Sequence, residues 1–407
     1  MEFLNAITAQ EALEQIRSFP LHQSRSSAIE TGKALGRVLA ADVKAAENIP
    51  PFSRSLVDGY AVVAKDTYGA KETSPAFLSL IGQVAVGEDA TLSLHEGQTI
   101  YLATGAMIPA GTEAVVMQEY TRVTSDAVEV TKALRKGENI VFAGEDIQRE
   151  TVVLTKGTRL GPFDLGVLSA LGVTKVEVFD KPRVGLISSG NEIVDIETAS
   201  PPPGTVRDIN RYAITGLLEQ TGCDVTFLGI ARDTLDDISE KLKKAEEFDL
   251  ILVSGGSSKG QADFITDCIE RLGGKILFHG INIRPGKPTI FGSLWSKPIF
   301  GLPGHPVSCS MVVIRFVAQL VKDMAGQRAE ITPPLRGVLS TNVPSSYGVE
   351  EYVRVRVENS DQGLAVSPLF GKSSVVSSLS KAHGYVVVAE GREGLEQGEW
   401  LEVNLFG

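Results

Sequence analysis

The stretch LILVSGGSSKGQADF (250–264) places one lysine and one carboxylate beside a run of bare backbone. Its first four residues are apolar and continuous, which predicts a buried strand, and the apolar spacing after Asp263 predicts a helix. Gly255 and Gly256 would let a ligand approach the main chain, and the free N–H groups at a helix start favour an anion. A plain tight turn explains this stretch alone equally well. The G-x-x-x-x-G-K-[ST] string of a P-loop does not occur.

Acidic side chains follow three predicted strands of the same region. Glu192 lies in SSGNE, Asp233 in ARD and Asp263 in KGQAD. Carboxylate oxygens are the ligands that Mg²⁺ prefers, and a metal bridging phosphate oxygens would polarise an anhydride. The basic stretch RPGKP (284–288) could hold phosphate or another oxyanion. Each carboxylate alone is better explained as a solvated or capping residue, and it is the repetition after successive strands that favours a site. The chain has no Cys/His cluster for zinc.

The segment LPGHP (302–306) precedes a strongly apolar helical stretch. Its two prolines fix backbone angles and remove two N–H donors, so a rigid seat for an anion or a cofactor is one interpretation. His305 could be a base or a ligand there. A polar loop residue at the helix start is the interpretation that we favour for it.

Alternating strands and helices across 183–326 would position these loops. We expect strands at RVGLIS, DVTFLGI, DLILV, KILFHG, PTIFG and PIFGL, and helices at 209–220, 235–248, after 263 and at 307–324. This rhythm predicts an open, largely parallel sheet with helices on both faces. Ligands bind at the carboxyl ends of such strands, so Glu192, Asp233, Lys259 and Asp263 should converge with the 302–306 loop.

The remaining segments predict three further parts, and the fold class is α/β plus β, multi-domain. Residues 1–45, with an apolar face of Ala12, Leu13 and Ile16 and a second helix near 28–39, would join 146–182 in a helical linking domain. Residues 46–145 read as a β-rich second domain. The doubly wound, mostly parallel α/β domain spans 183–326. Residues 329–407, with runs such as YVRVRV, predict a C-terminal β-barrel-like domain.

Bulk composition excludes several classes of function. The net charge of −11 over 407 residues argues against nonspecific nucleic-acid binding, which depends on neutralising phosphates. Three widely spaced cysteines support neither a disulfide scaffold nor a zinc knuckle. No apolar run reaches the ~20 residues that cross a membrane, and no signal peptide is recognisable. We therefore expect a soluble, cytoplasmic protein without nucleic-acid or membrane partners.

Seven motifs in order resemble one family over nearly the whole chain. They are PPFSRSLVDGYAV, ATGAMIPAGTEAVVMQE, GENIVFAGEDI, PRVGLISSGNEIV, SGGSSKGQADF, RPGKP and LPGHPVS. Together they resemble the MoeA-type molybdopterin molybdenumtransferase family, which includes the gephyrin E domain. The resemblance implies Mg²⁺-assisted insertion of molybdate into adenylylated molybdopterin, with release of AMP and of the molybdenum cofactor. It also implies an elongated, L-shaped subunit in a homodimer, with the active crevice between the α/β domain of one subunit and the β-rich domain of the other.

The resemblance also implies roles for individual residues. The catalytic residues would be Asp58, Thr104, Asp146, Glu192, Asp233 and Asp263, the last three also binding magnesium. The pterin substrate would lie against Ser188, Ser189, Gly190, Gly255, Gly256, Ser257, Ser258, Lys259, Gly260, Pro303, Gly304, His305 and Pro306. Molybdate would lie against Arg284, Lys287, Pro288, Arg354, Ser373 and Ser374. Asp58 is remote from the crevice in sequence, so it needs the partner subunit or a fold-back to reach it.

A few positions depart from the usual family pattern. The family usually has Asp-Asn at Ser53-Arg54, valine at Ser257 and Lys259, and asparagine at His305 and His383. These changes leave open whether molybdate or tungstate is used. They also leave open a second function, that of a pterin-binding or cofactor-binding paralogue without turnover that acts as a carrier or regulator. A scaffold role is the weakest of the alternatives.

Overall fold

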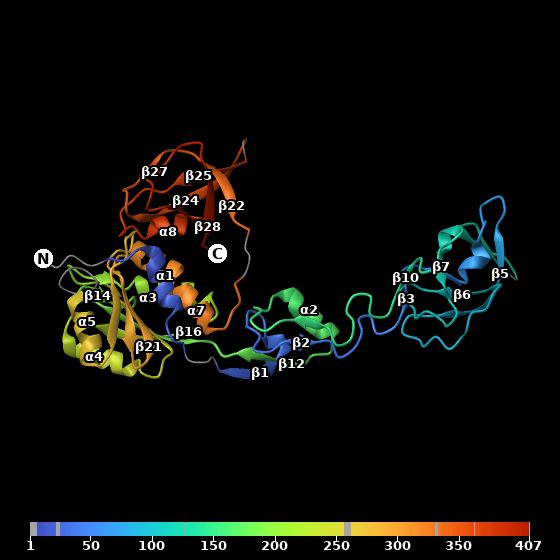
Figure 1. The fold of residues 1–407 in the computed structure, drawn as a ribbon, viewed down its shortest axis with the longest axis horizontal. Coiled ribbons are helices and arrows are strands. Elements are labelled where there is room, and N and C mark those ends of the chain that lie inside the picture. Colours follow the sequence, from blue (N-terminus) through green and yellow to red (C-terminus); the bar gives the residue numbers. More distant parts are fainter. Residues whose placement is uncertain are drawn as a thin grey trace.

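The computed structural model describes residues 6–21, 25–125, 127–255, 262–329, 333–361 and 363–406, without the side chains of 262 and 263. The chain is elongated (Figure 1). An α/β region and the C-terminal barrel lie side by side at one end, a small linking region lies in the middle, and the β-rich region lies at the far end. Within the described residues, no helix is long and apolar enough to cross a membrane.

The α/β region is built on a six-stranded sheet of order β16-β13-β17-β21-β20-β18. Its strands are β13 (Arg183–Ser189), β16 (Asp224–Ala231), β17 (Leu250–Ser254), β18 (Lys275–His279), β20 (Ile290–Leu294) and β21 (Lys297–Leu302). All six lie where the sequence predicts strands. The first three pairings are parallel, whereas β20 pairs antiparallel with β21 and with β18. The sheet is therefore mixed, because the short turn at Trp295 and Ser296 joins β20 and β21 in a hairpin.

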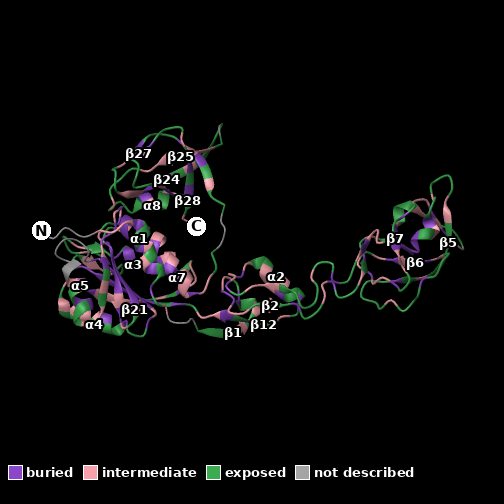
Figure 2. Cartoon of the chain, in the orientation of Figure 1, coloured by how far each residue is buried: buried purple, intermediate pink, exposed green. Residues whose placement is uncertain are grey.

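Helices cover both faces of this sheet, as the alternating pattern predicts. The helices are α1 (Ala9–Arg17), α3 (Asn210–Glu219), α4 (Leu235–Lys244), α5 (Ala262–Arg271), α6 (Pro306–Val312), the π-helical segment η4 (Val313–Val317) and α7 (Ala318–Met324). One core contains residues of α1, α3, α6, η4 and α7, and a second core on the other face contains residues of α4 and α5. Figure 2 shows the buried residues concentrated along the strands between these layers.

Helix α1 begins at a capping box. The Thr8 hydroxyl accepts from the Glu11 N–H, and the Glu11 carboxylate accepts from the Thr8 N–H at 2.8 Å, which satisfies two backbone donors of the first turn. The apolar stripe Ala9, Ala12 and Ile16 then packs into the α/β core. The amphipathic start of the chain therefore belongs to the α/β core, and not to the linking region with which we grouped it.

The predicted helix near 28–39 is wrong. The segment forms strand β1 (Ser26–Glu30) and a short 3-10 turn, η1 (Thr31–Lys33). Strand β1 pairs antiparallel with β12 (Lys175–Phe179), and this long-range pairing overrides the weak local pattern. Gly32 and Gly36, the latter with φ of +74°, are unfavourable for a continuous helix.

The linking region is completed by three further elements. They are β2 (Val43–Lys44), β11 (Val152–Leu154) and α2 (Pro162–Ala170). Strand β2 pairs with β11. The segment that leads into the β-rich region therefore lies beside the segment that leads out of it. Helix α2 supplies the helical part expected in this linking region, which otherwise consists of short strands.

The β-rich region contains a six-stranded sheet of order β7-β4-β6-β5-β9-β8 and the strand pair β3-β10. The strands are β3 (Arg54–Ser55), β4 (Gly59–Val62), β5 (Ala76–Val84), β6 (Gln98–Leu102), β7 (Ala114–Met117), β8 (Thr121–Val123), β9 (Val128–Val130) and β10 (Ile140–Val141). Two 3-10 turns, η2 (Ala64–Thr67) and η3 (Gln118–Tyr120), join them. The β-rich character predicted for this stretch is confirmed.

The C-terminal region is a closed five-stranded barrel. Strand order is β24-β25-β22-β28-β26, and pairing of β26 with β24 closes the ring. The elements are β22 (Leu335–Leu339), β24 (Glu350–Ser360), β25 (Gly363–Pro368), α8 (Ser377–Lys381), β26 (Gly384–Val388) and β28 (Trp400–Leu405), with a small pair β23 (Val343–Pro344) and β27 (Gly394–Leu395). Strand β19 (Ile283–Arg284) leaves the α/β region and pairs with β24, which fixes the barrel against that region.

Candidate functional site

A cavity of about 530 Å³ lies at the carboxyl ends of the parallel strands, and we call it the strand-end pocket. It gathers residues from the loops after β13, β17 and β21, as the fold rule predicts. The predicted site residues that line it are Ser188, Ser189, Glu192, Gly255, Pro288, Pro303, Gly304, His305, Pro306 and Ser374. A short parallel pair, β14 (Ile193–Val194) and β15 (Val206–Arg207), forms one wall. The structure therefore brings the β13 loop and LPGHP together.

Asp233 lies next to this cavity and is held by the β13 loop. Its Oδ1 accepts from the Ser189 hydroxyl at 2.8 Å, and its Oδ2 accepts from the Asn191 N–H at 3.3 Å. In return the Asp233 N–H donates to the Asn191 side chain. The loops after the two neighbouring strands β13 and β16 are thus fixed together, with the Glu192 carboxylate one residue beyond Asn191.

Gly255 is required by close approach of two backbone segments. Its φ is +103°, and a Cβ there would lie 2.0 Å from the Ser189 carbonyl oxygen. Its N–H donates to the Leu302 carbonyl at 3.2 Å. The three loops of the strand-end pocket consequently meet at one glycine.

Two buried residues of the strand-end pocket were missed by the sequence analysis. The Ser188 hydroxyl donates to Asp208 Oδ2 at 2.5 Å, and the Asn210 amide donates to the Ser254 hydroxyl and to the Gly304 carbonyl, both at 2.9 Å. Asn210 thereby connects the end of β17 to the LPGHP loop. The available signal was D-x-N at the start of the predicted 209–220 helix, which resembles an ordinary capping sequence.

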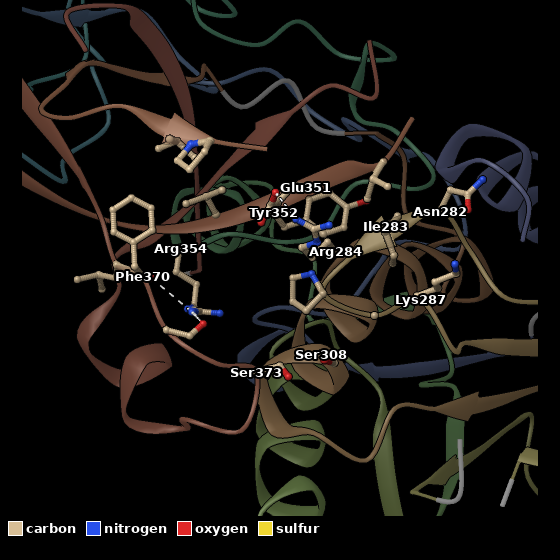
Figure 3. Close-up of a pocket in the computed structure, with 18 of the residues that line it drawn as sticks. Asn282, Ile283, Arg284, Lys287, Ser308, Glu351, Tyr352, Arg354, Phe370 and Ser373 are labelled. Atoms are coloured by element: carbon tan, nitrogen blue, oxygen red, sulfur yellow. Dashed lines mark hydrogen bonds and ion pairs between the residues drawn. The ribbon is translucent and has the colours of Figure 1, made fainter. Parts of the chain in front are cut away.

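A second cavity, of about 580 Å³, lies between the α/β region and the barrel, and we call it the basic pocket (Figure 3). The predicted oxyanion residues Arg284, Lys287, Pro288, Arg354 and Ser373 line it. Figure 3 shows Arg354 and Lys287 on opposite sides of the cavity, with Ser308 and Ser373 below them. Strand β19 supplies one cationic wall and β24 the other.

The cations of the basic pocket outnumber its carboxylates. Arg284 pairs with Glu351 at 3.5 Å. Arg354 is 6% exposed and donates to the Leu369 and Gly371 carbonyls at 3.4 and 3.2 Å, and its Nε finds no partner in the described chain. Burial lowers the pKa of the Arg354 guanidinium. Lys287 is exposed, and no carboxylate of the described residues pairs with it.

The strand-end pocket and the basic pocket adjoin each other. Pro288 and Ser308 line both cavities, and the neighbours Ser373 and Ser374 line one each. The two cavities therefore share part of their wall.

Three predicted catalytic residues lie elsewhere, in the β-rich region at the far end of the chain (Figure 1). Asp58 Oδ1 accepts from the Thr104 N–H at 2.7 Å and from its hydroxyl at 3.0 Å. Asp146 is exposed in the loop after β10, which pairs with β3 just before Asp58. The structure thus brings Asp58 and Thr104 together but separates them from both cavities.

The rest of the predicted site lies outside the described residues. This applies to Gly256, Ser257, Ser258, Lys259 and Gly260 and to the side chain of Asp263. Among the residues that are described, no three Asp, Glu, His or Cys side chains gather closely enough to hold a metal ion. The expected convergence is therefore met for Glu192 and the 302–306 loop, with Asp233 adjacent.

Comparison with known proteins covers the whole chain. Three family models match it in order: the MoeA N-terminal region (domains I and II) over 7–172, a probable molybdopterin binding domain over 185–323, and the MoeA C-terminal region (domain IV) over 336–406. The molybdopterin molybdenumtransferase of Haemophilus influenzae is 32% identical over 97% of this chain and 98% of its own. The chain belongs to the MoeA family.

Other members of the MoeA family agree with this assignment. The molybdopterin molybdenumtransferase of Bacillus subtilis is 30% identical, over 100% of this chain and 95% of its own. Two crystal structures of the molybdopterin biosynthesis MoeA protein of Pyrococcus horikoshii match with a TM-score of 0.83 each, at 36% and 32% identity and over 99% and 98% of this chain. The resemblance noted in the sequence is confirmed, and MoeA-family architecture extends over all the regions described above.

Proposed function

We propose that this protein inserts molybdate, or tungstate, into adenylylated molybdopterin and releases AMP and the completed cofactor. The observation that carries the proposal is the adjoining pair of cavities: one is rich in cations, and the other lies at the carboxyl ends of parallel strands. Two substrates that must react with each other need two such seats with a common wall. Membership of the MoeA family, whose relatives include proteins named molybdopterin molybdenumtransferase, supports the same reaction.

The basic pocket is the proposed seat of the oxyanion. Arg354 is a buried residue, and a buried guanidinium loses hydration and is costly without a counter-ion. Burial accordingly lowers the pKa of Arg354. A bound dianion would supply the missing charge to Arg354 and Lys287 together. Charge-assisted hydrogen bonds to such an anion are about twice as strong as neutral ones.

The strand-end pocket is the proposed seat of the pterin nucleotide. Its buried serines, Asp208 and Asn210 offer donors and acceptors in fixed orientations, which suits a polar ring system. Pro303 and Pro306 hold the LPGHP backbone rigid. The reacting end of the substrate would point to Ser308 and Pro288, where the basic pocket begins.

The carboxylates at the strand ends fit magnesium in kind. Mg²⁺ is commonly held by one or two carboxylates, substrate phosphates and waters, so it does not need a three-residue protein cluster. Glu192 and Asp233 would hold it, with Asp263 as the third candidate. When bound, the ion would neutralise phosphate charge and so favour departure of AMP.

The protein's own side chains would orient and neutralise the reactants. Lys287 and Arg354 hold the oxyanion and offset its two negative charges, which brings it to the edge of the strand-end pocket without electrostatic repulsion from the nucleotide. Ser189 and Asn191 keep Asp233 in one orientation. Fixed groups of this kind favour a reactive geometry because they need not reorganise during the reaction.

A second copy of the chain would complete the site. Asp58, Thr104 and Asp146 lie too far from the cavities to act within one subunit of this shape (Figure 1). The loops that carry them also expose Phe52, Leu56 and Phe142, at 38, 58 and 50%. Apolar side chains gathered around a functional loop suggest a surface that a partner covers. We therefore propose a homodimer in which the β-rich region of each subunit reaches the cavities of the other.

Release of AMP tests the proposal. The purified protein is incubated with adenylylated molybdopterin, molybdate or tungstate, and Mg²⁺, and nucleotides are quantified by chromatography. We expect AMP only when both oxyanion and Mg²⁺ are present. Tight pterin binding without AMP release under either oxyanion would refute turnover and favour the carrier or regulator alternative.

A further inference from the structure

His305 connects the two cavities through a single hydrogen bond. Its ring lines the strand-end pocket, whereas its partner Ser373 lines the basic pocket. His305 Nδ1 lies 3.0 Å from the Ser373 hydroxyl oxygen. The two residues come from the α/β region and from the barrel, so the bond crosses the contact between these regions.

A second bond fixes the position of Ser373 independently. The Val307 N–H, in the first turn of α6, donates to the Ser373 carbonyl at 3.1 Å. His305 itself makes no side-chain cap to this helix within the described chain. The main chain at Ser373 is therefore anchored without the imidazole, and the imidazole acts on the hydroxyl group alone.

The direction of the His305–Ser373 bond decides what the hydroxyl can do next. A serine hydroxyl has one proton and two lone pairs. When Nδ1 is unprotonated it accepts that proton, and the hydroxyl has none left for an anion. When Nδ1 carries a proton it donates to the Ser373 oxygen, and the hydroxyl proton is free to turn into the basic pocket. The imidazolium does this and also adds a positive charge.

We infer that His305 is a positioning residue that takes up a proton when an oxyanion binds, and so turns the Ser373 hydroxyl toward that anion. The inference rests on the proposed function, because it assumes that the oxyanion occupies the basic pocket. An asparagine at this position could donate a hydrogen bond but could not change its charge. The proton linkage is thus a property of His305 itself.

The surrounding charges are compatible with this role. The charged side chains that line the two cavities within the described residues are Glu192, Arg207, Asp208, Arg284, Lys287, Glu351 and Arg354. Glu351 is already paired with Arg284, and both oxygens of Asp208 already accept hydrogen bonds. A bound dianion would be the new negative charge nearest to the imidazole. Lys259 and Asp263 lie outside the described residues.

Anion binding to the protein without pterin tests the inference. Sulfate, molybdate and tungstate are titrated by calorimetry between about pH 6 and about pH 8, the range in which histidines change charge. We expect the affinity of the wild type for each anion to fall about tenfold as the pH rises over this range, because the anion binds the protonated form of the site more tightly. Sulfate stays a dianion throughout, so its profile reports the protein alone.

Three variants separate the histidine from the rest of the site. His305→Asn should retain binding with less than about a twofold change over the same range. Ser373→Ala should bind more weakly and should also lose most of the pH dependence. His383→Asn is the matched control, because His383 Nδ1 lies against the Val357 backbone on the barrel and lines neither cavity. Its profile should equal that of the wild type.

The outcomes distinguish this inference from the proposed function. Undiminished pH dependence in His305→Asn would overturn it, as would full pH dependence in Ser373→Ala, because charge alone would then account for the effect. Binding that is strong but independent of pH in the wild type would overturn it while leaving the oxyanion seat intact. Absence of binding for all three anions would instead refute the oxyanion seat, and with it the inference.

Discussion

At the scale of single residues, Lys287 offers the cleanest test of the basic pocket. It is exposed and unpaired with any described carboxylate, so Lys287→Ala should fold normally. We expect AMP release to fall about 10²-fold or more, which is the usual loss when an enzyme is deprived of one group that stabilises charge. The KM for molybdate should change more than kcat. Lys297→Ala is the control. Lys297 lies at the start of β21, away from the cavities at the other end of that strand, and it donates to the Glu246 carbonyl. Equal rates in the two variants would contradict the role of Lys287.

Gly59, next to Asp58, shows how the backbone positions a remote site residue. A Cβ on Gly59 would lie 1.9 Å from the Val116 carbonyl oxygen on the paired strand β7. Gly59→Ala should therefore destabilise the protein by about 1–3 kcal/mol, as overpacked cores do, measured by thermal melting. Gly166→Ala in α2 is the control, because nothing lies within 4 Å of the new Cβ and a helical alanine is favoured. An unchanged melting temperature in Gly59→Ala would show that β4 and β7 separate easily.

The residues that sequence reasoning found and missed differ in a physical way. Loops after strands were visible, because glycines, prolines and charges stand out against apolar runs, as in LPGHP. Asp208 and Asn210 were not visible, because their function arises only when Ser188, Ser254 and Gly304 approach them from other strands. Pairings of that kind span tens of residues of chain and leave no local pattern.

At the scale of elements, the π-helical segment η4 anchors the barrel through Arg315. Its guanidinium lies 3.6 Å from Glu350 and 5.3 Å from the centre of the Tyr352 ring, and the Tyr352 hydroxyl donates to the same carboxylate at 2.5 Å. Burial raises the pKa of Tyr352 above its usual range, so it remains a donor. Insertion of one π-turn reorients a side chain relative to an α-helix, which explains how a core helix presents a cation to β24.

Arg315→Met should weaken this contact without leaving a void. Glu350, with its side chain 22% exposed, would lose its cation, so we expect a loss of about 1–3 kcal/mol and a lower melting temperature. The control is Arg336→Met. Arg336 and Glu402 are 2.6 Å apart, but both side chains are exposed, so this substitution should lower the free energy of unfolding by less than about 1 kcal/mol. Similar losses in both variants would mean that the η4 contact stabilises no more than a surface ion pair.

Element prediction succeeded where burial imposes a strong periodicity. The six strands and the covering helices of the α/β region follow their apolar runs closely. The stretch 307–324 was predicted as helical, although not as partly π-helical. The segment 28–39 failed because β1 obtains its hydrogen bonds from β12, about 150 residues away. Parallel order could not be assigned to β20 and β18 either, since the tight turn between β20 and β21 decides it.

At the scale of the whole molecule, the decisive fact is distance. Asp58, between β3 and β4, and Glu192, after β13, belong to regions at opposite ends of the elongated chain (Figure 1). The order of the motifs alone left open whether a fold-back or a partner subunit brings them together. Two long connections separate them, and the paired strands β2 and β11 hold these connections together midway. The homodimer is first implied by the family resemblance, and the elongated shape supports the proposal that each subunit contributes two half-sites.

Mixing two inactive variants tests whether the half-sites combine across subunits. Asp58→Ala and Lys287→Ala should each be nearly inactive alone. If the β-rich region of one subunit serves the cavities of the other, a mixed dimer has one site with both lesions and one intact site. After subunit exchange about half of the dimers are mixed, so about a quarter of wild-type AMP release should return.

A double variant carrying both changes in one chain, mixed with Asp58→Ala, has no intact site and serves as the control. Sites built within single chains would give no recovery in either mixture, because every chain would still lack one of the two residues.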